Sequence, residues 1–443
     1  MSSKTGYEHL WMPFTSHEDF IKHPPLVIER GSGIYVFDSR GRKYIDAVGS
    51  WWVSILGHCN EEISAAIRDQ LGKLEHVLMA GFITPPALEL SQILGELLPR
   101  PLSRIFYSDD GSTSVEVALK IALQYHAIRG SNRSAFVALG GGYHGDTLGA
   151  MSVGAIPSFH SLFHDRFKKQ YYTDSPYCYR CPVGKEEKSC SAECMNSLQK
   201  ILNERGSEIA ACIFEPMVQG AVGMRVYPPK VLKKIFDLCK EYAVITIADE
   251  VAMGLGRTGK MFACDHAGVV PDIMCLAKGL TGGYLPLAVT AVKEEIYETF
   301  KGDFRSDKTF NHGHTFTGNP LAASAACAAM KLIIKKQLPQ SAEKVMSFFA
   351  AKLESLNNFD NVGGIRHLGF AGAFEIVKDK ESKERFPAEE RVTFRICQKA
   401  IEKGLIIRPL GDTIYYMPPF TVNEDELSSI FSITREAIKE VLE

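Results

Sequence analysis

The sequence has neither a block of like charges nor a long uninterrupted apolar segment. Its 50 Lys and Arg residues nearly balance its 52 Asp and Glu residues, for a net charge of −2, which argues against binding to nucleic acid or to an anionic membrane surface. The apolar run that follows Pro320 reaches Lys331 too early to span a bilayer. The first residues, M-S-S-K-T-G-Y-E-H-L-W, contain no apolar signal segment, so we expect a cytoplasmic protein.

Cysteine is present, but its pattern is not that of a disulfide framework. The chain has eleven cysteines, an odd number, and seven are scattered singly, as in proteins that keep their thiols reduced. A spacing that could supply four thiolates to zinc is found at Cys178, Cys181, Cys190 and Cys194. The second pair is spaced less typically for zinc, so we favour the alternative, a loop insertion at about 172–196 with packed thiols and no metal.

The composition and pattern are those of a globular α/β protein. The 443 residues, 45% apolar and 23% charged, suffice for one large domain and a smaller one. Between about residue 76 and residue 330, short apolar runs alternate with longer segments of helical spacing, which predicts a mostly parallel sheet covered on both faces. The apolar runs of strand length are 135–139, 211–214, 243–248, 273–277 and 288–292.

A helix is predicted after the apolar segment I-F-Y-S-D-D. The apolar residues that follow share one helical face over 115–123; Ser112 is placed to cap the N-terminus and Gly130 to end the helix. Because the first backbone amides of a helix are free, Gly111 and Ser112 could bind a phosphate. An ordinary structural cap is the alternative, since such caps are common.

The two ends of the chain differ from its middle. The segment I-Y-V-F-D-S-R-G-R-K-Y-I-D predicts a hairpin that turns at Ser39–Gly41, and R-P-L-G-D-T-I-Y-Y-M predicts one that turns at Gly411–Asp412. We expect residues 1–75 and 331–443 to combine into a smaller α+β domain. This domain would flank a large domain formed by residues 76–330.

Two charged residues stand at the ends of apolar runs. Asp249 closes A-V-I-T-I-A-D, and Lys278 follows D-I-M-C-L-A, so buried strands would deliver both side chains to the edge of one cleft. Pyridoxal phosphate (PLP) needs such a pair, because a lysine forms a Schiff base with its aldehyde and a carboxylate keeps its pyridine nitrogen protonated. Taken alone, the pair is more often an ordinary ion pair or two solvated ends.

Three ordered segments resemble class III aminotransferases, which are PLP-dependent enzymes of fold type I. They are D-E-V-A-M-G-L-G-R-T-G-K, L-A-K-G-L-T-G-G-Y-L-P-L-A-V and H-G-H-T-F-T-G-N-P-L-A, and the similarity extends over nearly the whole chain. The segments S-W-W-V, G-Y-H-G-D-T-L-G-A-M-S-V and R-P-L-G-D-T-I-Y-Y-M-P-P resemble the subfamily that transaminates 8-amino-7-oxononanoate in biotin synthesis. The resemblance implies a homodimer and a ping-pong reaction with S-adenosylmethionine or lysine as amino donor.

The resemblance also implies which residues hold the cofactor. Lys278 would form the Schiff base and then move the proton, Asp249 would pair with the pyridine nitrogen, and Tyr143 would lie against one face of the ring. The remaining implied contacts are Gly111 and Ser112 at the phosphate, Val251 on the opposite ring face, Gln219 at the phenolate oxygen, and Thr315, beside His314, reaching the phosphate from the other subunit.

For the substrate, the resemblance implies a carboxylate clamp and an apolar wall. Arg408 would bind the carboxylate, because a guanidinium group matches it with two parallel hydrogen bonds. Trp51 would form part of the wall for the aliphatic chain, and Gly313 would contribute backbone there. Considered in isolation, Trp51 and Trp52 are equally typical of plain core packing, a lone Tyr143 would most often be a core residue, and a lone Arg408 would most often be a surface or ion-pair residue.

One position departs from the pattern of the subfamily. The N-terminal motif resembles W-x-P-Y-T, whereas this chain has W-M-P-F-T, so Phe14 lacks the tyrosine hydroxyl. Loss of one hydrogen bond in a mostly dry pocket costs about 1 kcal/mol, or up to about tenfold in rate. This departure leaves open another class III aminotransferase that acts on ω-amino acids or diamines. A non-catalytic metal-binding or regulatory protein on the same fold is a further alternative, supported only by the four clustered cysteines.

Overall fold

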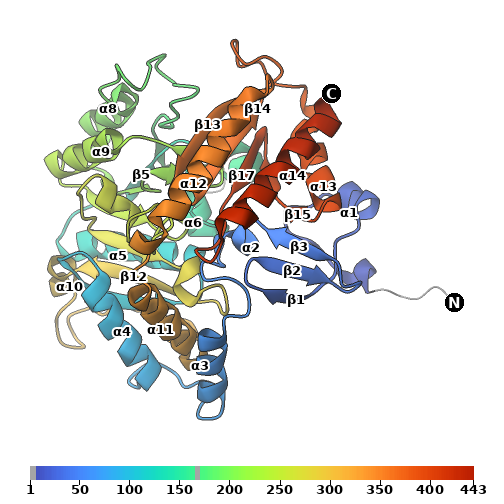
Figure 1. Cartoon of the computed structure of the whole chain (residues 1–443). Helices are drawn as coiled ribbons and strands as arrows, with labels where there is room; N and C mark the ends of the chain where they lie inside the picture. The colour runs from blue at the N-terminus through green and yellow to red at the C-terminus, as the bar shows by residue number, and fades with distance from the viewer. Residues whose placement is uncertain (1–5, 165–169) are drawn as a thin grey trace.

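A mixed, mostly parallel sheet forms the centre of the molecule. The computed structural model describes residues 6–164 and 170–443, and its elements are shown in Figure 1. The central sheet has seven strands in the order β4-β12-β11-β10-β7-β5-β6, in which β12 runs antiparallel to both neighbours and the other pairs are parallel. Its strands are β4 (Leu102–Ser108), β5 (Ala135–Ala138), β6 (Tyr171–Tyr172), β7 (Ile209–Phe214), β10 (Ile245–Asp249), β11 (Ile273–Leu276) and β12 (Ala288–Lys293).

Helices cover both faces of this sheet, as the alternation of the sequence predicts. The predicted apolar runs all form strands, and the buried residues of β7, β10 and β11 place them in the core. The helices of this part are α3 (Glu61–Leu71), α4 (Pro85–Leu97), α5 (Gly111–Ile128), α6 (Leu148–Ser152), α7 (Pro157–His164), α8 (Asn196–Arg205), α9 (Pro229–Glu241), α10 (Glu294–Thr299) and α11 (Pro320–Lys335).

The two ends of the chain meet in smaller sheets. One sheet has the order β1-β2-β3-β15 and another the order β13-β14-β17-β16; β3 from the N-terminal region pairs in parallel with β15 from the C-terminal region. The elements of the two ends are α1 (His17–Lys22), β1 (Ile28–Ser32), β2 (Tyr35–Asp38), β3 (Lys43–Asp46), α2 (Gly49–Trp52), α12 (Glu343–Glu354), β13 (Val362–Leu368), β14 (Ala371–Ile376), α13 (Val392–Glu402), β15 (Leu405–Ile406), β16 (Arg408–Leu410), β17 (Thr413–Tyr416) and α14 (Glu424–Leu442). The short mid-chain strands β8 (Val218–Gln219) and β9 (Arg225–Val226) pair with each other in a separate sheet.

Both predicted hairpins are confirmed. Strands β2 and β3 pair antiparallel around the turn at Ser39–Gly41, and β16 pairs antiparallel with β17 around Gly411–Asp412. Helices α12, α13 and α14 lie against the second of the smaller sheets in Figure 1. The domain boundaries near residues 75 and 330 stay a prediction.

The predicted helix after β4 is confirmed, but its N-cap is not the predicted residue, Ser112. Helix α5 spans Gly111–Ile128, and its N-cap is Asp110, not Ser112. The Asp110 carboxylate accepts a hydrogen bond from the amide of Thr113, whose hydroxyl in turn accepts from the Asp110 amide. This reciprocal capping box occupies Asp110 and leaves Ser112 inside the first helical turn, with its hydroxyl free for another partner.

The four clustered cysteines lie in an irregular segment before α8. Cys194 is buried, the other three are half-buried, and all four are free thiols. Burial, followed by the nearby Glu187 and the other three thiols, raises the pKa of Cys178 to about 12. Within residues 6–164 and 170–443, no group of three or more His, Cys, Asp or Glu side chains is placed to hold a metal ion.

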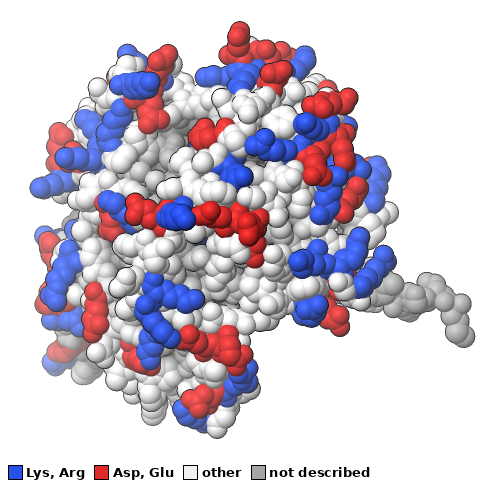
Figure 2. All heavy atoms as spheres, viewed as in Figure 1, with Lys and Arg blue, Asp and Glu red and all other residues white. Residues whose placement is uncertain are grey.

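The charge on the molecular surface is mixed. Figure 2 shows Lys and Arg interspersed with Asp and Glu over the visible face, with no extended patch of one sign. In the part of the chain that the structure describes, no helix is long and apolar enough to cross a membrane.

Candidate active site

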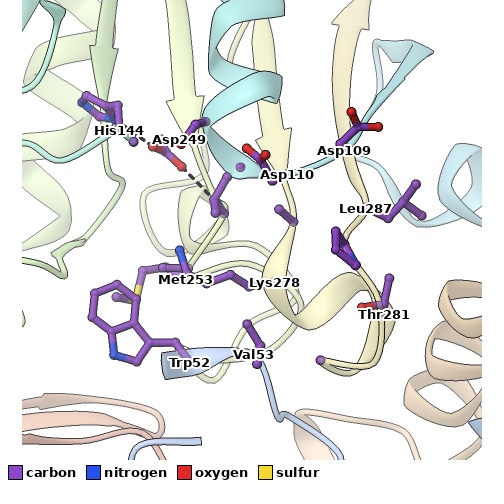
Figure 3. Close-up of a pocket in the computed structure, with 18 of the residues that line it drawn as sticks. Trp52, Val53, Asp109, Asp110, His144, Asp249, Met253, Lys278, Thr281 and Leu287 are labelled. Atoms are coloured by element: carbon purple, nitrogen blue, oxygen red, sulfur yellow. Dashed lines mark hydrogen bonds and ion pairs between the residues drawn. The ribbon is translucent and has the colours of Figure 1, made fainter. Parts of the chain in front are cut away.

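A cavity of about 440 Å³ opens at the edge of the central sheet. Parallel strands end at one edge of a sheet, so the residues that follow β7, β10 and β11 lie together there. These residues are Glu215, Asp249 and Lys278, and all three line the cavity. Figure 3 shows Lys278 and Asp249 converging with the N-terminal turn of α5 around this space. The sequence-based prediction that Asp249 and Lys278 share one cleft is thus confirmed.

Lys278 is a half-buried amine without a counter-ion among the described residues. Its Nζ makes no hydrogen bond or ion pair with the residues that the structure describes, and it lies 5.1 Å from the ring centroid of Trp52. Burial lowers the pKa of Lys278, while Asp249, Glu215 and Asp110 act in the opposite direction. A lysine of lowered pKa holds a larger fraction of the neutral, nucleophilic amine.

Asp249 is held by two neighbours. One carboxylate oxygen lies 2.7 Å from Nδ1 of His144, a contact marked in Figure 3, and the other accepts a hydrogen bond from the Val251 amide at 3.1 Å. His144 is buried, and its Nε2 has no hydrogen-bond partner among the described residues. Sequence reasoning missed His144, although it directly follows Tyr143 in G-G-G-Y-H-G.

Glu215 is a second buried carboxyl group in the same cavity, and it was also missed. It accepts hydrogen bonds from the amides of Tyr143 (3.1 Å) and Gly220 (2.8 Å). Burial raises the pKa of Glu215 to about 7, and the negative charge of Asp249 acts in the same direction. The strand-end rule that singled out Asp249 would also have found Glu215, because it follows the all-buried strand β7.

The N-terminus of α5 offers free donors to the cavity. Gly111 and Ser112 line it, and their amides and the Ser112 hydroxyl have no partner among the described residues, because the capping box uses the amides of Asp110 and Thr113. Gly145 lies close by with φ +121°, and a Cβ there would fall 2.0 Å from the Ser112 Oγ. This glycine therefore keeps the Ser112 side chain in place beside an opening suited to an anion.

Tyr143 and Val251 both line this cavity. Tyr143 donates a hydrogen bond from its hydroxyl to Asp146 at 2.8 Å, which fixes its ring. Val251 packs close to Gly111, where a Cβ would lie 2.7 Å from the valine side chain. Both predicted ring-covering residues are thus at the cavity.

Gln219 is not placed as predicted. Its side chain is fully buried, its oxygen accepts a hydrogen bond from Ser175 at 2.7 Å, and its nitrogen donates to the Gly140 carbonyl at 3.0 Å. Both ends of the amide are therefore occupied by protein groups, and the residue does not line the cavity. Glu215, not Gln219, lines the cavity.

A second cavity of about 670 Å³ adjoins the first, since Lys278, Trp52 and Tyr143 line both. Its apolar wall consists of Phe14, Trp51 and Phe159. The Phe14 ring packs edge-on against Trp51 and against Phe159, with centroids 5.4 and 5.3 Å apart. The sequence did not identify Phe159, which lies on the short helix α7.

Arg408 lies in this second cavity with Trp51. Its guanidinium carbon sits 4.7 Å from the Trp51 ring centroid, and it forms no ion pair with the described residues. A guanidinium group held on an aromatic ring, without a carboxylate of its own, is available to a ligand carboxylate. The structure therefore brings together Phe14, Trp51 and Arg408 as predicted.

Gly313, His314 and Thr315 lie elsewhere in the single chain. They line a separate cavity of about 600 Å³. His314 Nδ1 is 2.8 Å from a carboxylate oxygen of Asp109, which lines the first cavity. Within one chain, Thr315 and Gly313 thus reach neither the free amides of α5 nor Arg408.

Comparison with known proteins places this site in a family. A model of the class III aminotransferase family matches residues 18–438. Adenosylmethionine-8-amino-7-oxononanoate aminotransferases are similar to this chain: that of Geobacter sulfurreducens is 41% identical, over 98% of this chain and 96% of the relative, and that of Anoxybacillus flavithermus is 43% identical, over 98% and 96%.

Solved structures agree with these relatives. The aminotransferase of the same name from Methanocaldococcus jannaschii superposes with a TM-score of 0.93 at 39% identity, covering 99% of this chain and 98% of that one. A PLP-bound amine transaminase from an uncultivated Pseudomonas species gives a TM-score of 0.93 at 33% identity, covering 98% of each chain. The fold is that of the PLP-dependent transaminases of fold type I, and the chain belongs to the class III aminotransferases.

Proposed function

We propose that this protein is a PLP-dependent aminotransferase that converts 8-amino-7-oxononanoate to 7,8-diaminononanoate in biotin biosynthesis, with S-adenosylmethionine as amino donor. One observation carries the proposal: a half-buried lysine, a held carboxylate and the first amides of a helix line a cavity that adjoins the cavity of Arg408, and neither Lys278 nor Arg408 has an ion pair among the described residues. The names of the relatives at about 40% identity supply the substrate and the donor.

The residues of the first cavity fit PLP. The amides of Gly111 and Ser112 would bind its phosphate, Asp249 its pyridinium nitrogen, and Lys278 its aldehyde carbon. Tyr143 and Val251 would cover the two faces of its ring. When bound, PLP supplies an electron-accepting ring that makes the C–H bond beside the substrate amine acidic.

The chain's own residues then handle the proton. Lys278, whose pKa burial lowers, would in its neutral form take the proton from the substrate carbon and return it to the neighbouring carbon of the cofactor. Asp249, fixed by His144 and Val251, would keep a proton on the pyridine nitrogen of the cofactor.

The second cavity fits the proposed keto acid. Arg408 would bind the carboxylate, and Lys278, which lines the same cavity, would meet the keto group. Phe14, Trp51 and Phe159 would cover the aliphatic chain between them. An apolar wall beside one cation suits a long chain that ends in a carboxylate.

We further propose that the active site is completed in a homodimer. Thr315 of the partner subunit would reach the phosphate, with His314 beside it, and Gly313 of the partner subunit would contribute backbone to the substrate pocket. The proposal is supported by the exposure of Thr315 and by the apolar side chains near it, since Leu78 and Phe316 are 54% and 58% exposed. Large exposed apolar groups of this kind are typical of interfaces. The proposed donor and pathway favour a cytoplasmic location.

The half-reaction with the donor tests the function. Purified holoenzyme is mixed with S-adenosylmethionine, lysine or a diamine in turn, and the absorbance of the bound cofactor is followed. S-adenosylmethionine should change the spectrum, and 8-amino-7-oxononanoate should restore it. A response only to diamines or ω-amino acids would instead favour the alternative class III activity, and the Lys278→Ala variant should respond to none of them.

A further inference from the structure

Both tryptophans of the substrate pocket lie on a left-handed turn. Gly49, Ser50, Trp51 and Trp52 have φ values of 56°, 45°, 64° and 78°, and Ser50 and Trp51 have ψ values of 57° and 44°. L-residues other than glycine adopt this conformation singly and at a cost in free energy. Three such residues in succession at a candidate active site indicate strain that the surrounding structure must hold.

The turn determines where the two indole rings lie. Trp51 lines the substrate cavity beneath Arg408, and Trp52, only 4% exposed, lies beside Lys278. Figure 3 shows Trp52 and Val53 reaching the cofactor cavity from this short segment. A right-handed backbone at the same residues would point the rings elsewhere, because the direction of each Cβ follows φ and ψ.

The carboxylate of Asp46 is the group that holds the start of the turn. It is 3% exposed, and one oxygen accepts a hydrogen bond from the Val48 amide at 3.2 Å. The other oxygen accepts from the Ser50 hydroxyl at 2.7 Å and lies 3.0 Å from Nε2 of His58. Buried hydrogen bonds to a carboxylate are strong, and together they tie the turn to the end of β3.

The far end of the turn is held by a different residue. The buried guanidinium group of Arg257 approaches the Trp52 carbonyl at 3.4 Å and donates to the Pro418 carbonyl at 2.6 Å. Gly49 packs so closely that a Cβ there would lie 2.8 Å from the Met417 carbonyl. The backbone around 417–418 thus limits how far the turn can relax, while Asp46 sets its local geometry.

We propose that Asp46 is a positioning residue for the substrate pocket, which fixes the left-handed turn of residues 49–52 and thereby the positions of Trp51 and Trp52. Its effect on the keto acid rests on the proposed function, but its effect on the tryptophans does not. The chain has three tryptophans, and the third, Trp11, is 96% exposed. In a Trp11→Phe background, fluorescence therefore reports Trp51 and Trp52 alone.

The test compares Asp46→Asn with Asp38→Asn in that background, as holoenzymes. Asp38 is a matched control because it ends the neighbouring strand β2, is 4% exposed, and accepts hydrogen bonds from Arg42 and Tyr44, yet it lines neither cavity. We expect Asp46→Asn to increase quenching of the tryptophans by acrylamide. It should also raise the KM for the keto acid roughly tenfold, with a smaller change in kcat, because the loss of one charge-assisted hydrogen bond has an effect of about this size. Asp38→Asn should lower the Tm and leave quenching and KM unchanged.

A rescue separates the turn from general stability. Adding Ser50→Gly to Asp46→Asn should recover part of the KM and of the quenching, because glycine adopts positive φ without cost. Unchanged quenching in Asp46→Asn, or an equal change in Asp38→Asn, would overturn the proposal. If Asp46→Asn fails to fold, the same quenching and KM measurements on Ser50→Ala test the proposal, since this variant removes only the 2.7 Å hydrogen bond between Ser50 and Asp46. Quenching needs no substrate, so a failure of the proposed reaction leaves this test intact.

Discussion

Replacement of Arg408 by glutamine should identify the part of the substrate that the second cavity binds. The guanidinium group lines that cavity with Lys278 and has no ion pair among the described residues. A bidentate pair supplies two charge-assisted hydrogen bonds, and because Arg408 is exposed we take the lower end of their range, about 2–3 kcal/mol in total. This corresponds to a loss of about 30- to 150-fold in kcat/KM.

The loss should fall on KM. The carboxylate does not change during transamination, so its contact with Arg408 is equal in the ground state and the transition state. Arg408→Lys keeps the charge but loses the planar fork, and should recover only part of the affinity. Steady-state kinetics with 8-amino-7-oxononanoate and with its carboxamide analogue measure both effects.

The carboxamide analogue and a second arginine provide the controls. The wild type and Arg408→Gln should differ little in kcat/KM for the carboxamide, since neither can form the charged pair with it. Arg391 also stacks on an aromatic ring, 4.1 Å from that of Phe394, and pairs with Asp19 outside this cavity, so Arg391→Gln should retain full activity. An equal loss for the acid and the carboxamide would refute carboxylate binding by Arg408.

Three further predictions concern Phe14, Glu215 and the clustered cysteines. Phe14→Tyr should raise turnover of the keto acid by up to about tenfold; steady-state kinetics that show no gain would mean that the hydroxyl is not needed. Burial raises the pKa of Glu215 from 4.5 to about 7, so its stabilising contribution is complete below about pH 4.5 and is lost as the pH rises through about 7. The Tm of Glu215→Gln should therefore fall less than that of the wild type between about pH 6 and about pH 8, and an equal fall would contradict this reason. Atomic emission should find no stoichiometric zinc in protein purified without chelator, whereas one zinc per chain would show that Cys178, Cys181, Cys190 and Cys194 bind metal.

The sequence predicted the parts of the site that depend on strand ends. Asp249 and Lys278 could be placed in one cleft because short, wholly apolar runs precede them and parallel strands end at one edge of a sheet. Glu215 satisfies the same rule, because it directly follows the buried strand β7. Gln219 is not available to the cofactor, because both ends of its amide form hydrogen bonds with Ser175 and Gly140.

Other features depend on contacts that no local pattern encodes. Asp110 displaces Ser112 as the helix cap because Thr113 returns its hydrogen bond, a pairing that the sequence allows but does not require. The left-handed turn at Trp51 and Trp52 contradicts the preference of aromatic residues for negative φ. It forms because Asp46, four residues before Ser50, and Arg257, from a distant segment, hold it, and neither contact can be read from S-W-W-V alone.

Product formation tests the central claim most directly. Purified holoenzyme is incubated with 8-amino-7-oxononanoate and S-adenosylmethionine, and 7,8-diaminononanoate is quantified by mass spectrometry, with the Lys278→Ala variant and lysine as donor in parallel. The proposed function predicts catalytic formation of the diamine by the wild type with S-adenosylmethionine and none by Lys278→Ala. Absence of the diamine with both donors, while the same enzyme transaminates an ω-amino acid or a diamine, would contradict it.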